Sequence, residues 1–131
     1  MEHETLLTAS RAAAKHASAP YSNFPVGAAL VTTSGAMFSG CNIESPAYPQ
    51  TLCAERVAIF AAVAAGERPV CLAVSCVKGD PADPNSLTPC GACRQVMMDQ
   101  MGPRGTILVD GVGEFTVAEL LPYGFRLPGS R

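Results

Sequence analysis

Two short cysteine motifs constrain the fold of this chain more than any other feature. They are Cys53-Ala-Glu55-Arg56 and Pro89-Cys90-Gly-Ala-Cys93, and each opens a segment with a helical pattern. The start of a helix offers free N–H groups and a partial positive charge, which both favour a thiolate over a thiol. Three such thiolates are suited to bind a soft divalent cation such as zinc. The sequence therefore predicts one zinc ion per chain, bound by Cys53, Cys90 and Cys93.

Three protein ligands leave one position of zinc open, which is typical of catalytic sites, whereas structural sites have four ligands. The alternative is a structural site completed by Cys41, Cys71 or Cys76. Cys71 and Cys76 lie five positions apart in an apolar, strand-like run and so on opposite faces of it. A second alternative is a thiol oxidoreductase, because Cys-x-x-Cys at a helix start is also a redox motif.

The redox interpretation leaves Glu55 unexplained. This acid stands two residues from a predicted ligand, where it could reach a zinc-bound water without binding the metal, and we predict that it shuttles protons. The simpler alternative is an acid that only complements the helix dipole. Arg56 is predicted to hydrogen-bond the sulfur atoms and offset their charge, and its simpler alternative is a solvated surface residue.

The order of predicted elements favours an α/β fold. Helical patterns cover Glu4 to Ala17, Cys53 to Ala65 and Cys90 to Met101. Strand patterns cover Val26 to Thr32, Ala36 to Ile43, Pro69 to Val77, Thr106 to Val109 and Phe115 to Val117, with a turn at Gly111 to Gly113 and a tail from Gly124. We expect a single domain over residues 1–131, with a mixed, about five-stranded sheet between helices in a three-layer α-β-α sandwich.

Charge and hydropathy exclude several classes of partner. Nine Lys plus Arg residues stand against eleven acids, so no basic stripe is available for nucleic acid. No window approaches the roughly 20 apolar residues of a membrane span, and the acidic start lacks the pattern of a secretory signal. We therefore expect a cytoplasmic protein with a small-molecule substrate. The segment from Cys53 to Ala65 is apolar all round except at Glu55 and Arg56, which indicates burial against another subunit.

With both motifs in place, the chain resembles the small cytidine deaminase family from Tyr21 to Phe125. The wider class of zinc deaminases has a His or Cys ligand in a first motif and Pro-Cys-x-x-Cys as its second. Three further segments share the resemblance: Tyr21-Ser-Asn-Phe24-Pro-Val-Gly-Ala-Ala-Leu30, Gly40-Cys-Asn42-Ile-Glu44 and Leu120-Leu-Pro-Tyr-Gly-Phe125.

The resemblance implies a mechanism and a substrate pocket. Zinc hydroxide attacks C4 of cytidine or 2′-deoxycytidine, Glu55 moves the protons, and the products are the uridines and ammonia of pyrimidine salvage. By resemblance Phe24 packs against the base, Asn42 and Glu44 bind the ribose 3′-hydroxyl, and the backbone of Ala54 contacts the pyrimidine edge. The small three-cysteine branch is homotetrameric with shared active sites, so Tyr48 and Phe125 are expected to reach the pocket of a neighbouring subunit.

The sequence departs from the family pattern at Glu44-Ser-Pro-Ala-Tyr-Pro49, where relatives more often have Asn-Ala and then Tyr-Gly. This stretch borders the predicted pocket, so an alternative substrate is a modified cytosine nucleoside such as blasticidin S. The Asn42 and Glu44 pair favours ordinary nucleosides. A non-catalytic zinc module or a thiol oxidoreductase is the remaining alternative, and either would make Glu55 dispensable.

Overall fold

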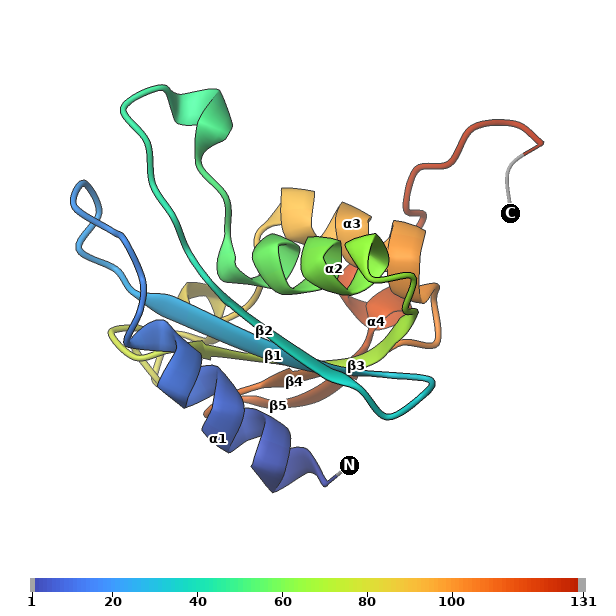
Figure 1. Cartoon of the computed structure of the whole chain (residues 1–131), viewed down its shortest axis with the longest axis horizontal. Helices are drawn as coiled ribbons and strands as arrows, with labels where there is room; N and C mark the ends of the chain where they lie inside the picture. The colour runs from blue at the N-terminus through green and yellow to red at the C-terminus, as the bar shows by residue number, and fades with distance from the viewer. Residues whose placement is uncertain (1, 130–131) are drawn as a thin grey trace.

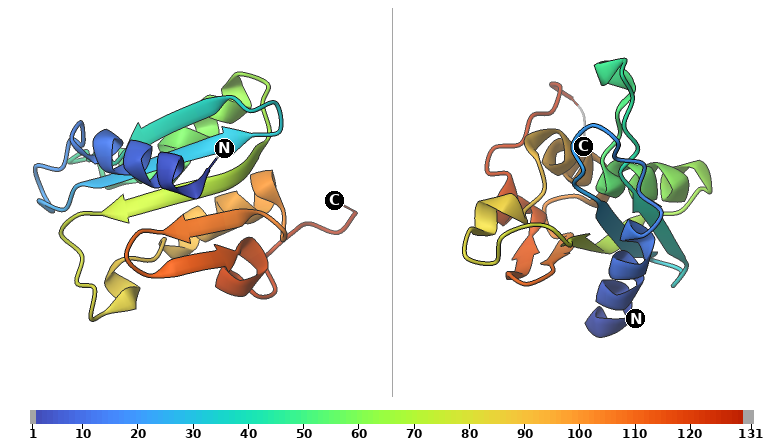
Figure 2. Two further views of the ribbon diagram at one scale, coloured as in Figure 1. Left: turned by 90° about the horizontal axis from the view of Figure 1, so that it is seen from below. Right: turned by 90° about the vertical axis from the view of Figure 1, so that its left-hand side faces the viewer.

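A computed structural model describes residues 2–129, and its centre is one five-stranded sheet. The strands are β1 (Val26–Thr32), β2 (Met37–Cys41), β3 (Pro69–Cys76), β4 (Thr106–Val109) and β5 (Gly113–Thr116), in the spatial order β2-β1-β3-β4-β5. β3 and β4 are parallel and the other neighbours are antiparallel, so the sheet is mixed. Figure 2 shows this order in its left panel.

Helices cover both faces of the sheet. α1 (His3–Ala14) packs on one face, against β1 and β3. α2 (Ala54–Ala64), α3 (Gly91–Met101) and the short α4 (Val117–Leu120) lie on the other face (Figure 1). Two 3₁₀ turns, η1 (Tyr48–Gln50) and η2 (Pro84–Ser86), lie in the connections. The predicted three-layer α-β-α sandwich with a mixed, five-stranded sheet is confirmed.

The apolar core divides into two clusters because strand residues alternate between faces. On β1, Ala28 and Leu30 pack toward α2 and α3, while Ala29 and Val31 pack toward Leu6 of α1. Cys76 borders the first cluster and Cys71 the second, which confirms that they face opposite sides of β3. Among the described residues, the cluster of possible metal ligands consists of Cys53, Cys90 and Cys93 and does not include Cys41, Cys71 or Cys76.

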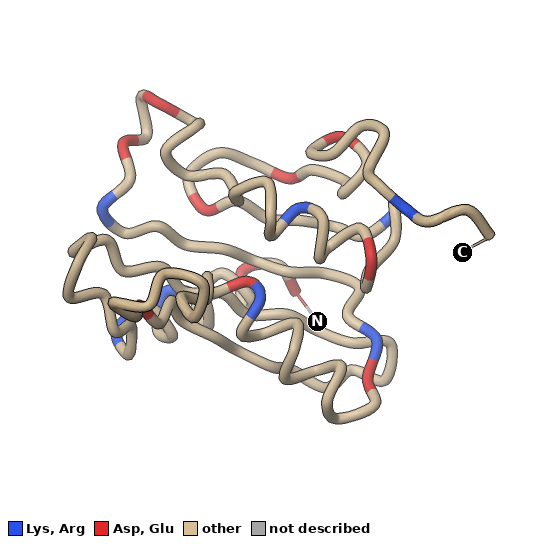
Figure 3. The backbone as a smooth tube through the Cα atoms, turned by 90° about the horizontal axis from the view of Figure 1, so that it is seen from above, with Lys and Arg blue, Asp and Glu red and all other residues tan. Residues whose placement is uncertain are grey.

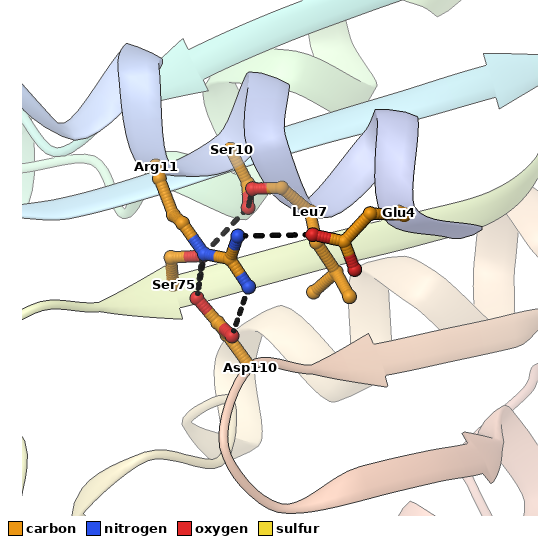
Figure 4. Close-up of polar contacts among 6 residues, drawn as sticks. All are labelled: Glu4, Leu7, Ser10, Arg11, Ser75 and Asp110. Carbon is orange, nitrogen blue, oxygen red and sulfur yellow. Dashed lines mark hydrogen bonds and ion pairs between the residues drawn. The ribbon is translucent and has the colours of Figure 1, made fainter. Parts of the chain in front are cut away.

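Polar contacts fix α1 to the sheet (Figure 4). Arg11 donates from Nε and Nη2 to the two carboxylate oxygens of Asp110, at 2.7 and 2.9 Å. The buried hydroxyls of Ser10 and Ser75 lie 2.6 Å apart, and Ser75 also donates to Asp110 at 2.8 Å. Gly27 of β1 allows α1 to approach the sheet closely, since a Cβ there would lie 1.9 Å from the carbonyl oxygen of Ser10.

A second glycine sets the position of α2. A Cβ on Gly40 would lie 2.6 Å from the carbonyl oxygen of Ala54 and 2.7 Å from the amide nitrogen of Ala58, so only glycine lets the helix backbone come this close to β2. The opposite side of α2 stays uncovered, with Phe60 and Val63 exposed. The predicted burial of this helix against another subunit stays a prediction.

Some predicted boundaries were wrong. The helix predicted to Ala17 ends at Ala14, because the N–H groups of His16 and Ala17 bond to carbonyls three residues back, in a tighter turn. The strand predicted to Ile43 ends at Cys41, because Ile43 leaves β1 and pairs with Leu52. The tail predicted from Gly124 is described only to Gly129, so Ser130 and Arg131 lie outside the described residues.

The last strand and helix also differ from prediction. β5 begins at Gly113, which was predicted as a turn, and Val117 begins α4 instead of ending a strand. A capping box causes this change: the Thr116 hydroxyl accepts from the Glu119 amide, and the Glu119 carboxylate accepts from the Thr116 amide.

The charged residues of both signs are distributed along the described part of the chain (Figure 3). Figure 3 shows Lys and Arg interspersed with Asp and Glu along the backbone of residues 2–129. Within residues 2–129, no helix has the length and apolar character needed to cross a bilayer.

Candidate metal centre and active site

The starts of α2 and α3 bring three cysteines together. Cys53 is the N-cap of α2, Cys90 is the N-cap of α3, and Cys93 lies in the first turn of α3. Their sulfur atoms all lie within 4.8 Å of one another, with Cys53 to Cys90 at 3.9 Å and Cys90 to Cys93 at 3.4 Å. Tetrahedral zinc with Zn–S bonds of about 2.3 Å separates its sulfur ligands by about 3.8 Å. The spacing therefore suits zinc.

Arg56 directs its positive charge at this cluster. Its Nη2 donates to Cys53 Sγ at 3.5 Å, and its Nε is buried without a hydrogen-bond partner among the described residues. A hydrogen bond from Cys93 and the nearby guanidinium lower the pKa of Cys53 to about 5, while the same hydrogen bond and burial raise the pKa of Cys93. Negative charge on sulfur attracts a soft cation, and a guanidinium that hydrogen-bonds a thiolate supports it as a metal ligand. The residues present fit zinc.

Glu55 is an acid in an apolar place. It lies in the first turn of α2 and is only 4% exposed. Burial raises the pKa of Glu55 to about 7, and the charge on Cys53 adds to this effect. A carboxyl group with such a pKa exchanges protons near neutral pH, which is the property a general acid and base requires. The simpler alternative, an acid that only complements the helix dipole, does not account for this burial.

A pocket of about 360 Å³ opens over the cysteines and Glu55. The predicted site residues that line it are Phe24, Asn42, Glu44, Cys53, Ala54, Glu55 and Cys90. Seven further residues line the pocket and were not predicted as site residues: Ser22, Val26, Thr51, Leu52, Cys76, Ser86 and Thr88. Five of the seven stand within two residues of a predicted site residue, which was the available signal, and the exceptions are Cys76 and Ser86. A larger hollow of about 540 Å³ beside α1 contains none of the predicted site residues.

The two residues predicted to bind a sugar hydroxyl already bind backbone in this structure. Asn42 Oδ1 accepts from the Val26 amide at 2.8 Å, and its Nδ2 donates to the Phe24 carbonyl at 2.9 Å. Glu44 Oε1 accepts from the amides of Tyr21 and Ser22, both at 3.0 Å. These bonds hold the segment that carries Phe24 against the pocket.

Two predicted site residues lie outside the pocket of their own chain. Tyr48 is 80% exposed in the segment that extends from the body in Figure 1, and Phe125 is 68% exposed. Gln95 fixes the backbone of Phe125, accepting from its amide at 3.1 Å and donating to its carbonyl at 2.8 Å. The predicted contact of Tyr48 and Phe125 with a neighbouring subunit stays a prediction.

Comparisons with known proteins agree on one family. A family model described as the cytidine and deoxycytidylate deaminase zinc-binding region matches residues 1–108. The chain is 44% identical to a cytidine deaminase of Sporosarcina psychrophila, covering 95% of this chain and 92% of that protein. It is 42% identical to one of Halalkalibacterium halodurans, covering 95% of each.

Solved structures give the same result. The crystal structure of cytidine deaminase from Burkholderia pseudomallei superposes with a TM-score of 0.85 at 42% identity, covering 95% of this chain and all of that one. The structure of the Mycobacterium tuberculosis enzyme superposes with a TM-score of 0.82 at 34% identity, covering 97% and 99%.

Proposed function

The chain belongs to the cytidine and deoxycytidylate deaminase family, and on this premise we propose that it converts cytidine and 2′-deoxycytidine to uridine and 2′-deoxyuridine. The reaction consumes one water and releases one ammonia. The observation that carries the proposal is a buried Glu55 beside three clustered cysteines, in the same pocket as Phe24 and Glu44.

Cys53, Cys90 and Cys93 would hold one zinc ion per chain. When bound by three ligands, such an ion supplies Lewis-acid activation of water at neutral pH. Arg56 offsets the charge of the thiolates from beside Cys53. Glu55 accepts one proton of the attacking water and delivers it to N3 of the base. It then takes the proton of the new hydroxyl at C4 and passes it to the amino group, which leaves as ammonia.

The rest of the pocket binds and orients the nucleoside. Phe24 packs against the base, the backbone of Ala54 contacts its edge, and Asn42 and Glu44 bind the 3′-hydroxyl of the sugar. Because contacts at the 3′-position do not read the 2′-position, ribose and deoxyribose are both accepted. The convergence of these residues on one pocket supports the assignment.

The functional unit is a homotetramer of 131-residue chains, each folded as one catalytic domain. The uncovered apolar side of α2, with Phe60 and Val63, supports burial between subunits. Tyr48 and Phe125, exposed on their own chain, then complete the pocket of a neighbour. The unpaired cysteines support a reducing compartment, so we place the enzyme in the cytoplasm and in pyrimidine salvage.

The test is loss of the cytosine ultraviolet band when zinc-loaded protein meets cytidine or 2′-deoxycytidine. Glu55→Gln is expected to lower turnover by about 10²- to 10⁴-fold while zinc stays near one per chain. Glu114→Gln removes an exposed acid outside the pocket and is the matched control, with unchanged turnover. Full turnover in Glu55→Gln, or none in the zinc-loaded parent, overturns the proposal. Blasticidin S run alongside tests the modified-nucleoside alternative.

A further inference from the structure

The segment before β1 makes a sharp turn at the edge of the pocket. Asn23 has φ 53°, in the left-handed region that Asn tolerates better than most residues, and its amide donates to the Ala19 carbonyl at 3.0 Å. Its two neighbours, Ser22 and Phe24, both line the pocket. The turn therefore places a hydroxyl and an aromatic ring side by side on the same cavity.

The carboxylate of Glu44 holds the first half of this turn. Besides the amides of Tyr21 and Ser22, it accepts a short hydrogen bond from the Ser22 hydroxyl at Oε2. Hydrogen bonds from the Ser22 side chain and backbone lower the pKa of Glu44, so the carboxylate is ionised at neutral pH and only accepts. The hydroxyl proton of Ser22 consequently points to Glu44.

With its proton so directed, the oxygen of Ser22 is free to accept. It does so from the amide of Phe24 at 3.1 Å. The carbonyl of Phe24 accepts in turn from Asn42 at 2.9 Å. Both backbone polar groups of Phe24 are thus bound by side chains, and one of those side chains is bound to Glu44.

We propose that Ser22 is a positioning residue that couples recognition of the sugar at Glu44 to the placement of Phe24 against the base. The inference rests on the proposed function and deepens it. A sugar hydroxyl that donates to Glu44 shares the carboxylate with Ser22, so its presence alters the hydrogen bond that Ser22 makes. Because the same Ser22 Oγ accepts from the Phe24 amide, a change in its hydrogen bond to Glu44 also affects the position of Phe24. Nucleosides with a 3′-hydroxyl are thereby distinguished from those without one.

The test compares kcat and KM for cytidine and 3′-deoxycytidine, which offers Glu44 no 3′-donor. Ser22→Ala is expected to raise KM for cytidine about tenfold, the scale of one hydrogen bond to a charged group, with kcat changed less than about threefold. For 3′-deoxycytidine the same variant is expected to change KM less than about twofold. Ser22→Thr keeps the hydroxyl and is expected to restore the preference for cytidine.

Ser34→Ala is the matched control. The Ser34 hydroxyl also makes a short hydrogen bond to a carboxylate, that of Glu67, but neither residue lines the pocket. It is expected to leave both substrates unchanged. An equal loss on both substrates in Ser22→Ala means that Ser22 only stabilises the turn, which overturns the inference.

Amide hydrogen exchange at Phe24 provides a second measurement that needs no turnover. Ser22→Ala is expected to accelerate exchange at this amide, and Ser22→Thr is expected to preserve its protection. Unchanged exchange in Ser22→Ala contradicts the Ser22 to Phe24 link. If the zinc-loaded parent leaves cytidine unchanged, the proposed function fails, and the exchange data still decide whether Ser22 positions Phe24.

Discussion

The Nη2 atom of Arg56 lies 3.5 Å from the Sγ atom of Cys53, on the first turn of the same helix. The buried Nε of Arg56 has no hydrogen-bond partner among residues 2–129, so this guanidinium has unused donor capacity next to the sulfur cluster. Removing it leaves the negative charge of the thiolates without its nearest cation.

Arg56→Ala is therefore expected to weaken zinc retention about 10- to 100-fold, the usual effect of losing a group that supports metal ligands. Arg56→Lys is expected to restore part of the loss, since it returns the charge without the planar fork of donors. Competition with a chromogenic chelator measures the affinity. Arg104→Ala, at an exposed position, is the control, and equal retention in Arg56→Ala and Arg104→Ala would contradict the role of Arg56.

Gly40→Ala tests how α2 is held on the sheet. Its Cβ meets helix backbone at 2.6 and 2.7 Å, which no rotamer change relieves, so we expect a loss of about 1–3 kcal/mol and displacement of the Cys53 end of α2. Urea unfolding and zinc content measure the two effects. Gly91→Ala adds a Cβ with no atom within 4 Å and is expected to keep its stability. If Gly40→Ala is as stable as Gly91→Ala, then α2 can move away from β2 without a loss in the free energy of unfolding, and the close approach is not required.

The contact between Arg11 and Asp110 makes the free energy of unfolding depend on pH in the acidic range. Hydrogen bonds from Arg11 lower the pKa of Asp110 below its unfolded value of about 3.9. A group with a depressed folded pKa stabilises the fold above the unfolded pKa and loses that contribution as pH falls through the folded value. The urea midpoint of the parent is expected to exceed that of Asp110→Asn near pH 6 and to approach it toward pH 2. A constant difference over this range would argue against the ion pair.

Acidic substitutions on the exposed side of α2 test whether this side is a subunit interface. Phe60 and Val63 are 43% and 41% exposed, and burying two carboxylates in their place is unfavourable. The double variant Phe60→Glu, Val63→Glu is expected to sediment as a smaller species. It is also expected to lose activity, because in the proposed homotetramer Tyr48 and Phe125 complete the pocket of a neighbour. Val77→Glu replaces an exposed valine elsewhere and is expected to keep the assembly of the parent. An unchanged mass in the double variant would place the interface on another surface.

Sequence patterns identified most of the elements because apolar periodicity is local. The strands Val26–Thr32 and Thr106–Val109 have the predicted bounds. Val117 was misassigned because Phe115 to Val117 has aromatic and β-branched side chains typical of a strand, although the Thr116 and Glu119 pair carried the signal of a helix start.

The residues of the candidate site also fall into those that local sequence motifs predict and those that only the tertiary structure brings together. The metal cluster was predictable because each cysteine belongs to a contiguous motif at a helix start. The position of Cys76 in the pocket lining was not predictable, because a cysteine at the end of an apolar strand has the pattern of a core residue. It lines the pocket only because of the way β3 packs against α2. The bond between Ser22 and Glu44 likewise exists only after two connections converge.

The anchoring of α1 has a consequence for the order in which the chain acquires structure during synthesis. Ser10 and Arg11 leave the ribosome early, yet their partners Ser75 and Asp110 follow 65 and 99 residues later. Until then the first helix has no complete surface to dock on, and the apolar side around Leu6 stays available to other nascent chains. The docking of α1 is therefore complete only when the chain has been synthesised through Asp110.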